Sequence, residues 1–160
     1  MNTVQIDTLA DHAEVIPTLA EWFKSEWAEY YALRTLDEIA EDFYTDLNRN
    51  RLPVRLVAFL AGELVGTIVL REYALAGYPE YQPGLGGLYV PEPYRKRGIG
   101  TELIRSGMET ARALGYQTLY TTTNTAEGIL ERLAWEPMGA VLHHGEPIAV
   151  YRYNINEGQG

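Results

Sequence analysis

The chain has 160 residues, of which 46% are hydrophobic, with no cysteine and a formal net charge of −9 at neutral pH. That length and apolar content fit a single domain with its own core and argue against a disordered chain. The absence of cysteine excludes disulfides, thiolate metal sites and a cysteine nucleophile, and the acidic balance argues against general binding to nucleic acid.

The positive charges are concentrated in one place. Residues 1–50 hold 11 acids against three bases, whereas residues 51–160 hold 11 acids against 10 bases, three of them adjacent at 95–97. One small basic island in an acidic body favours a confined anion site. Residues 1–15 lack the pattern of a signal peptide, and no apolar run approaches the ~18 residues of a membrane span. The sequence therefore predicts a soluble, cytoplasmic protein without a membrane partner.

The N-terminal third predicts a short strand followed by two helices. Val4 and Ile6 alternate with polar neighbours, as in a strand with one buried face. Apolar residues recur at helical spacing over 14–27, with Pro17 in the first turn, where proline is tolerated. The segment 35–38, Thr-Leu-Asp-Glu, has the form of a capping box and predicts the start of the second helix.

The middle of the chain predicts a hairpin and a further strand. Residues 54–60 and 64–70 are β-prone, and Ala-Gly-Glu at 61–63 forms a tight connection between them. Residues 76–87, rich in glycine, proline and tyrosine, predict a loop or an irregular approach to a strand. Residues 88–90 form a short β-prone run that the following proline ends.

The C-terminal part predicts helices that alternate with strands. In chain order these elements are a helix over 101–114, a strand over 117–123, a short helix over 126–134, and a hairpin of strands 138–143 and 148–153 around 145–147. The whole order mixes hairpin-linked antiparallel strands with two strand-to-helix crossovers, which indicates a mixed α/β fold. We expect a single domain over residues 1–156 and a frayed tail at 157–160.

The chemistry is concentrated in residues 88–101, where a strand, a basic turn and a helix start follow one another. The first amides of a helix lack intrahelical partners and point outward at the positive end of its dipole. Gly98 and Gly100 remove side chains that would keep a diphosphate from those amides, and Arg95, Lys96 and Arg97 add positive charge. This segment predicts an anion site.

Other phosphate motifs fit this segment less well. A Walker loop needs a lysine before its Ser/Thr, but Thr101 follows Gly100 directly. A dinucleotide fingerprint needs a third glycine, where this chain has Leu103. A glycine-rich turn with solvated cations is the alternative that the residues alone leave open.

Two motifs resemble those of one enzyme superfamily. Arg95-x-x-Gly98-x-Gly100 is similar to the Arg/Gln-x-x-Gly-x-Gly/Ala signature of the GNAT superfamily of N-acetyltransferases, and Val90-Pro91 precedes it at the usual distance. Downstream, Asn124 and the segment 129–135 resemble the second cofactor motif of that family. The resemblance implies a central, mostly antiparallel sheet with a splayed fourth and fifth strand pair and about four helices.

The same resemblance implies acetyl-CoA as cosubstrate and no metal. The pyrophosphate would lie on the amides of residues 97–101, the pantetheine amides would pair with the backbone of residues 88–90, and Asn124 would lie near the pantetheine arm. The residues expected to bind the cofactor are Leu88, Tyr89, Val90, Arg95, Lys96, Arg97, Gly98, Ile99, Gly100, Thr101 and Asn124.

The resemblance also implies direct acetyl transfer to a primary amine in a ternary complex, with the Val90 N–H as oxyanion donor. Many relatives have a glutamate before the Leu-x-Val run, but residues 83–87 contain no carboxylate, and Leu130 stands where many relatives have a tyrosine acid. Tyr89 is the first candidate for proton handling. Further candidates are Glu72, Tyr120 and His143, for each of which packing is the alternative role.

The acceptor is expected to be a small-molecule or peptide amine. Trp27, Tyr30 and Tyr31 lie at the link between the first two helices, which borders the acceptor pocket in this family, although such a stripe also fits a helix core. Nearby acids, Glu26 among them, would favour a cationic acceptor or form a solvated face. Adjacent histidines at 143–144 should point to opposite faces of a strand and not share a metal ion.

Three hypotheses therefore compete. The first is the N-acetyltransferase, the second is a non-catalytic acyl-CoA-binding sensor or regulatory module, and the third is an unrelated phosphate-binding or structural α/β domain. A homodimer is compatible with the resemblance, since many relatives are dimers.

Overall fold

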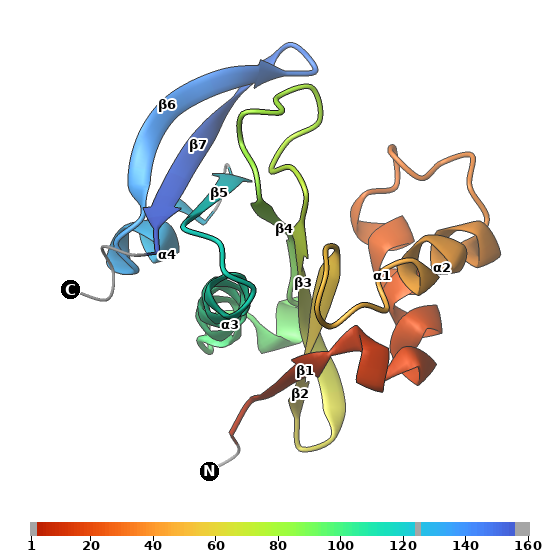
Figure 1. The fold of residues 1–160 in the computed structure, drawn as a ribbon. Coiled ribbons are helices and arrows are strands. Elements are labelled where there is room, and N and C mark those ends of the chain that lie inside the picture. Colours follow the sequence, from red (N-terminus) through yellow and green to blue (C-terminus); the bar gives the residue numbers. More distant parts are fainter. Residues whose placement is uncertain (1–2, 124–125, 156–160) are drawn as a thin grey trace.

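The computed structural model describes residues 3–123 and 126–155, which form a mixed α/β domain around one twisted sheet (Figure 1). The strand order is β1-β2-β3-β4-β5-β7-β6. The strands are β1 (Gln5–Thr8), β2 (Val54–Leu60), β3 (Glu63–Arg71), β4 (Gly84–Tyr89), β5 (Thr118–Thr123), β6 (Glu136–His143) and β7 (Glu146–Asn154). All neighbouring pairs are antiparallel except β4–β5, which is parallel. The predicted fold class is confirmed.

Helices cover both faces of this sheet. The α-helices in the described part of the chain are α1 (Ile16–Glu26), α2 (Leu36–Tyr44), α3 (Ile99–Ala113) and α4 (Glu127–Arg132). Short 3₁₀ turns η1 (Leu9–Asp11), η2 (Ala13–Val15) and η3 (Glu92–Tyr94) join them to the strands. Figure 1 shows α1 and α2 together on one side of β1–β4 and α3 on the other. None of the described helices combines the length and apolar character of a membrane span.

Two hydrophobic clusters hold the layers together. The larger one joins α3 to the sheet, and its fully buried members include Leu103, Leu85 and Leu119. The smaller one joins α1 and α2 to β2 through residues such as Phe23 and Val57. The two clusters lie on opposite faces because side chains alternate along each strand. Each face of β4 is therefore fixed against a different helical layer.

The start of each N-terminal helix follows the predicted local chemistry. Pro17 occupies the first turn of α1, where its missing N–H has no intrahelical partner to lose. At α2, the Glu38 N–H donates to Thr35 Oγ1 at 3.1 Å, and the Thr35 N–H donates to Glu38 Oε1 at 2.8 Å. This reciprocal pair is the predicted capping box, and it confirms that the second helix begins after Thr35.

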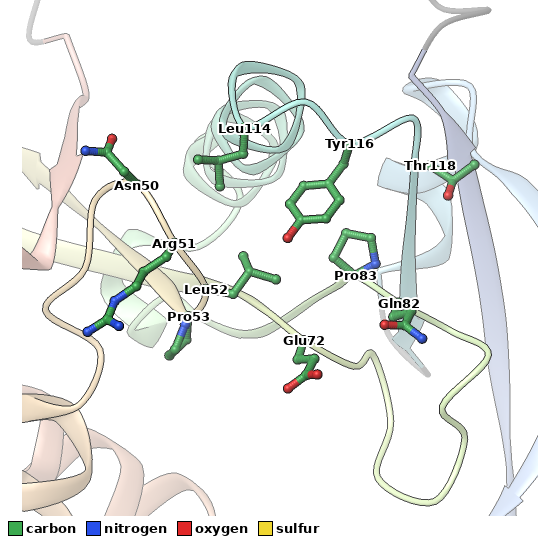
Figure 2. Close-up of a pocket in the computed structure, with 10 residues that line it drawn as sticks. All are labelled: Asn50, Arg51, Leu52, Pro53, Glu72, Gln82, Pro83, Leu114, Tyr116 and Thr118. Atoms are coloured by element: carbon green, nitrogen blue, oxygen red, sulfur yellow. The ribbon is translucent and has the colours of Figure 1, made fainter.

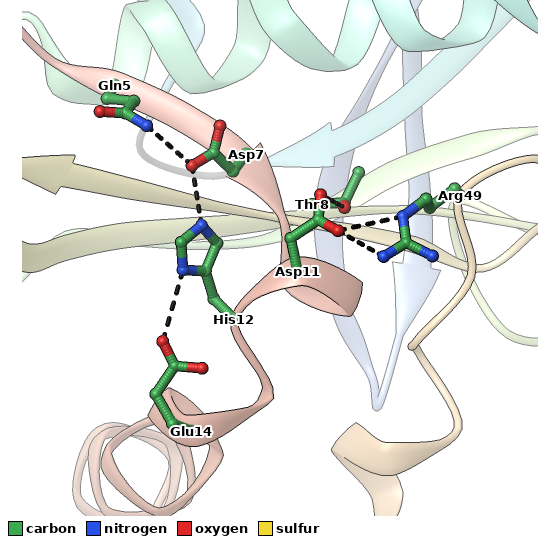
Figure 3. A network of polar contacts seen from close by, with 7 residues as sticks. All are labelled: Gln5, Asp7, Thr8, Asp11, His12, Glu14 and Arg49. Carbon is green, nitrogen blue, oxygen red and sulfur yellow. Dashed lines mark hydrogen bonds and ion pairs between the residues drawn. The ribbon is translucent and has the colours of Figure 1, made fainter.

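A polar network fixes the entry into α1 (Figure 3). His12 bridges two carboxylates, with Nε2 2.8 Å from Asp7 Oδ2 and Nδ1 3.4 Å from Glu14 Oε1, and its ring lies 4.7 Å from that of Phe59. Loss of hydration disfavours the charged ring, but the two carboxylates outweigh it and raise the pKa of His12. Beside this group, Arg49 forms an ion pair with Asp11.

Two hairpin turns carry left-handed residues. Ala61 and Gly62 form a two-residue turn between β2 and β3, with φ of 52° and 83°. The turn type favoured in such hairpins requires a positive φ at both residues. The β6–β7 turn has the same form at His144 and Gly145, with φ of 51° and 79°. The predicted turn at 145–147 was therefore placed too late, because β7 already begins at Glu146.

Strand β4 begins earlier than the sequence indicates. The prediction was a loop or an irregular approach to a strand over 76–87 and a strand over 88–90, whereas β4 spans Gly84–Tyr89. Its glycines favour a loop on composition, yet a Cβ at Gly84 would lie 2.2 Å from the Ala74 backbone N. The glycine is therefore needed because the connection between β3 and β4 passes close to this strand residue.

Candidate cofactor and acceptor site

Strands β4 and β5 separate soon after they meet. Their register contains the pairs Gly84↔Tyr120 and Leu85↔Thr121, and the Thr121 hydroxyl donates to the Leu85 carbonyl at 2.6 Å. Beyond Leu85, β5 continues alongside β7, so the β5-facing edge of the last β4 residues is outside this ladder. An unpaired strand edge offers main-chain groups to an extended ligand.

A bulge turns the end of β4. The β3–β4 register steps from Val69↔Gly86 to Thr67↔Tyr89, which inserts one extra β4 residue, and Gly87 adopts φ +61°. After the bulge, Leu88 lies toward α3, with its Cδ2 3.9 Å from the position of a Cβ on Gly100. Tyr89 lies on the opposite face, 5.4 Å from the Trp22 ring.

The start of α3 presents unpaired amides. Gly98 is the N-cap residue, with φ +82° and no side-chain cap, and the first bond of the helix runs from the Glu102 N–H to the Gly98 carbonyl at 3.1 Å. The amides of residues 99–101 therefore lack intrahelical partners. Lys96 is also left-handed, with φ +64°, which shapes the turn around this helix end.

These elements surround a cavity of about 370 Å³. Its lining residues are Val90, Tyr94, Arg95, Lys96, Gly98, Ile99, Gly100, Thr101, Ile129 and Arg132. Among the described residues, this lining contains three cationic side chains and no carboxylate. The cations reinforce the positive end of the α3 dipole, so the cavity suits a polyanion such as a diphosphate.

Most of the predicted cofactor residues meet here. Ile99 contributes only its backbone, since its side chain is 1% exposed in the core. Arg95 is held by its Nε–H, which donates to the Val90 carbonyl at 2.7 Å. Arg97 lies over the Tyr94 ring, 5.7 Å from its centroid, and is not among the lining residues. Asn124 lies outside the described residues.

The cavity lining also includes two residues that were not expected to bind the cofactor. Ile129 and Arg132 reach the cavity from α4, and Ile129 Cδ1 lies 3.8 Å from the position of a Cβ on Gly100. The signal for them was the second motif, because both belong to it. Leu130 from the same motif is instead 1% exposed in the core, so its side chain is a packing group.

Tyr89 belongs to an aromatic cluster on the α1 face of β4. Its ring centroid lies 6.0 Å from that of Trp27 and 6.4 Å from that of Phe23, and Arg95 Cζ lies 5.9 Å from its centroid. The residue is half-buried, at the end of the bulged strand. This places a phenol next to the backbone expected to hold a thioester.

The other proton-handling candidates lie elsewhere. Tyr120 pairs with Gly84, on the joined part of the β4–β5 ladder, and its ring lies 5.5 Å from that of Tyr81. His143 ends β6 at the hairpin turn, and Glu72 lines a different cavity. The structure therefore does not bring these three candidates together with Tyr89.

That different cavity, of about 550 Å³, lies at the opposite end of β4 and β5 (Figure 2). Figure 2 shows Glu72, Arg51 and Tyr116 around it, with Leu52 and Pro83 between them. Its lining mixes one acid and one base with amides and apolar groups, and it contains no helix start. It does not offer the converging amides and cations of the smaller cavity.

The adjacent histidines of the hairpin do not lie as expected. His143 and His144 were expected to point to opposite faces of a strand, but their ring centroids are 4.1 Å apart. The reason is that His144 is a left-handed turn residue rather than a strand residue. Within residues 3–123 and 126–155, no group of three or more His, Cys, Asp or Glu side chains is placed to hold a metal ion.

The sheet splits between β4 and β5, beside the amide-lined start of α3. The model of the acetyltransferase (GNAT) family matches residues 16–139, and the chain therefore belongs to this family. The resemblance inferred from the two motifs is confirmed.

Solved structures share the fold at low identity. An N-acetyltransferase from Staphylococcus aureus Mu50 is 17% identical with a TM-score of 0.74, over 96% of this chain and 99% of that chain. A putative acetyltransferase from Salmonella typhimurium, solved with its cofactor acetyl-CoA, is 13% identical with a TM-score of 0.72, over 98% and 96%. An aminoglycoside 6'-N-acetyltransferase complexed with coenzyme A is 18% identical with a TM-score of 0.74, over 94% and 97%. A comparison with curated protein sequences gave no significant match.

Proposed function

We propose that this protein is an acetyl-CoA-dependent N-acetyltransferase that acetylates a primary amine of a small molecule or peptide directly, in a ternary complex. The observation that carries the proposal is the cavity at the start of α3, where three unpaired amides and the cations Arg95, Lys96 and Arg132 converge beside the free edge of β4. A diphosphate with an extended amide-bearing arm fits this combination of anion site and strand edge.

The residues fit the cofactor without rearrangement of the helix start. Gly98 leaves the amides uncovered because it has no side chain to cap them. A Cβ at Gly100 would make ordinary contacts with Ile129 and Leu88, so a side chain larger than that of alanine would fill this part of the cavity. In this proposal, residues 98–101 and the three cations hold the pyrophosphate, and the backbone of residues 88–90 pairs with the pantetheine amides.

The bound cosubstrate supplies an acetyl thioester. The chain's own contribution is to orient that group along β4 and to direct the Val90 N–H at the carbonyl oxygen, where negative charge develops. An alkyl ammonium with a pKa near ~10.4 must lose a proton before attack. We assign this proton to Tyr89 or to a water beside it, because Tyr89 lies at the end of the bulged strand.

A non-catalytic acyl-CoA-binding module is the second candidate. It is favoured by the burial of Leu130 and by the absence of a carboxylate at residues 83–87. The two candidates share the cofactor cavity and differ only in turnover. The cytoplasmic location, the homodimer and the domain bounds 1–156 stay predictions.

Two measurements test the proposal. Calorimetric titration with CoA should give saturable binding that Arg132→Gln weakens about tenfold, since a charge-assisted contact contributes about 1.5–3 kcal/mol. Arg105→Gln, on the exposed face of α3, is the matched control and should bind CoA as the wild type does. Absence of CoA binding at millimolar concentration would refute both candidates.

Turnover separates the two candidates. If the protein is an enzyme, the rate of thiol release from acetyl-CoA should be higher with at least one amine of a panel of primary amines than without amine. CoA binding without amine-dependent release would establish the second candidate. Tyr89→Phe should lower kcat and alter its pH profile, and an unchanged profile would exclude Tyr89 from proton transfer.

A further inference from the structure

An arginine lies on the acceptor side of β4. Arg71 ends β3, and its strand neighbour Val69 pairs with both Arg55 on β2 and Gly86 on β4, so these positions share one face of the sheet. That face is the one covered by α1 and α2, because Arg55 Cζ lies 5.3 Å from the ring centroid of Phe23. The face is opposite to the α3 helix start that forms the anion cavity.

The guanidinium of Arg71 lies directly over the β4 backbone. A Cβ at Gly86 would lie 2.6 Å from Arg71 Nη2 and 3.0 Å from its Cζ, closer than such atoms approach. Glycine at this position therefore makes room for the guanidinium. The sequence position where many relatives have a glutamate is close to this point, so the local charge here is reversed.

Main-chain carbonyls hold the guanidinium in place. The Arg71 Nε–H donates to the Tyr73 carbonyl at 3.1 Å, and Nη2 donates to the Ala74 carbonyl at 3.3 Å. A guanidinium has five N–H donors, so most of its donor capacity stays available. Within the described part of the chain, no carboxylate forms an ion pair with Arg71, although the residue is exposed to solvent.

The groups around Arg71 leave its surroundings positive. Arg55 and Asp46 form an ion pair at 3.0 Å, and Arg55 also donates to Thr67 Oγ1 at 3.2 Å. Among the described residues, the Asp46 carboxylate favours the charged form of Arg71, and Tyr30, Tyr31 and Arg55 are the other titratable groups whose charges act on it. The Asp46 carboxylate is engaged by Arg55 and does not pair with Arg71. The available donors and the positive charge of Arg71 therefore favour an anionic ligand.

We propose that Arg71 binds a carboxylate of the acceptor, so that the acceptor is a small primary amine that also carries a carboxylate, such as an amino acid. This inference rests on the proposed acetyltransferase function. Gly86 lies two to four residues before the backbone assigned to the thioester, about 7–13 Å along a strand. The long arginine side chain covers part of that span. The planar guanidinium group of an arginine can donate two parallel hydrogen bonds to one carboxylate.

Sets of acceptors that differ in one group test the inference. Each set contains an amino acid, its amide and the amine without the carboxyl group, for example phenylalanine, phenylalaninamide and phenethylamine. In the wild type, kcat/KM should be at least about tenfold higher for the carboxylate member. Arg71→Gln should reduce this preference to within about twofold, mainly through KM. Arg71→Lys should retain part of it, and Arg105→Gln should retain all of it.

Other outcomes overturn the inference. Equal kcat/KM across each set in the wild type refutes it. An equal loss for all three members in Arg71→Gln also refutes it, because that result indicates that Arg71 only supports residues 73–74. A conserved circular dichroism spectrum and melting temperature would show that the variant is folded.

A binding readout keeps this test separate from the proposed function. Binding of each product in the presence of CoA is followed by the quenching of tryptophan fluorescence. The Kd of N-acetylphenylalanine should be at least about tenfold lower than that of N-acetylphenylalaninamide, and Arg71→Gln should remove this difference. Trp22 and Trp27 serve as reporters because both rings lie against Tyr89, near the end of β4 on the face covered by α1. A tighter-binding acid without turnover supports the inference while the catalytic proposal fails. Absence of tighter binding by the acid refutes the inference even if amines are acetylated.

Discussion

Gly98 and Gly100 of the anion turn differ in what a replacement changes: the backbone conformation matters at Gly98 and the space around the residue at Gly100. Replacement by alanine should therefore have a different effect at each position. At Gly98, φ is +82° and a Cβ would meet nothing within 4 Å, so alanine introduces only backbone strain of about 1–2 kcal/mol. At Gly100, within α3, a Cβ would make ordinary contacts of 3.8 Å with Ile129 and 3.9 Å with Leu88. Alanine there should stabilise the fold by about 0.5–1 kcal/mol through helix propensity.

Thermal and urea denaturation measure these opposite signs. For a domain of this size, 1 kcal/mol shifts Tm by about 2–4 °C, so Gly98→Ala should lower Tm by about 2–8 °C and Gly100→Ala should raise it by about 1–4 °C. CoA titration completes the set. Gly100→Ala should retain binding, because alanine is allowed in the family signature at this position. Gly100→Leu, with good helix propensity but a side chain that fills the space between Leu88 and Ile129, should lose binding.

Two results would refute this reasoning. If Gly100→Ala destabilises the protein as much as Gly98→Ala, the distinction between strain and space is wrong. If Gly100→Leu is folded and binds CoA as tightly as the wild type, the cavity at the start of α3 is not the cofactor site.

Two further predictions concern charges away from the cofactor. Because the pKa of His12 is raised in the folded state, its contribution to stability should be complete below about pH 6.5 and disappear as the pH rises through the folded-state pKa. The difference in unfolding free energy between wild type and His12→Asn, measured by urea denaturation from pH 5 to 9, should therefore shrink with rising pH, and a constant difference would contradict this. Asp46→Asn should destabilise the protein by about 3 kcal/mol, because it leaves the buried guanidinium of Arg55 without its carboxylate. The exposed pair Glu102–Arg105 gives the control, since Glu102→Gln should change stability by less than about 1 kcal/mol, and equal losses would contradict the role of burial.

The features that the sequence predicted correctly are local. The capping box at 35–38, the proline in the first turn of α1 and the tight connection predicted at 61–63, of which Glu63 already belongs to β3, each depend on a few consecutive residues. The turn at 95–101, whose role as an anion site stays a prediction, is local in the same sense, since its cations, glycines and helix start are contiguous. Such chemistry needs no knowledge of how the strands pair.

The features that the sequence did not predict depend on register and on distant segments. Gly86 and Arg71 are 15 positions apart, and only the β3–β4 pairing places the guanidinium over that glycine. Arg132 enters the cavity because α4 folds back on α3. The glycines of β4 favour a loop on composition, while tertiary contact requires them in a strand.

The sheet consists of two parts, β1–β4 and β5–β7, that are joined by the short β4–β5 ladder. This ladder contains the two pairs Gly84↔Tyr120 and Leu85↔Thr121. Residues lining the anion cavity come from both sides, since Val90 follows β4 and Arg132 belongs to the segment between β5 and β6. A ligand in this cavity would contact residues from both parts of the sheet and so hold the two parts together. Amide hydrogen exchange in β6 and β7 should therefore slow when the cavity is filled, although neither strand contributes a residue to its lining.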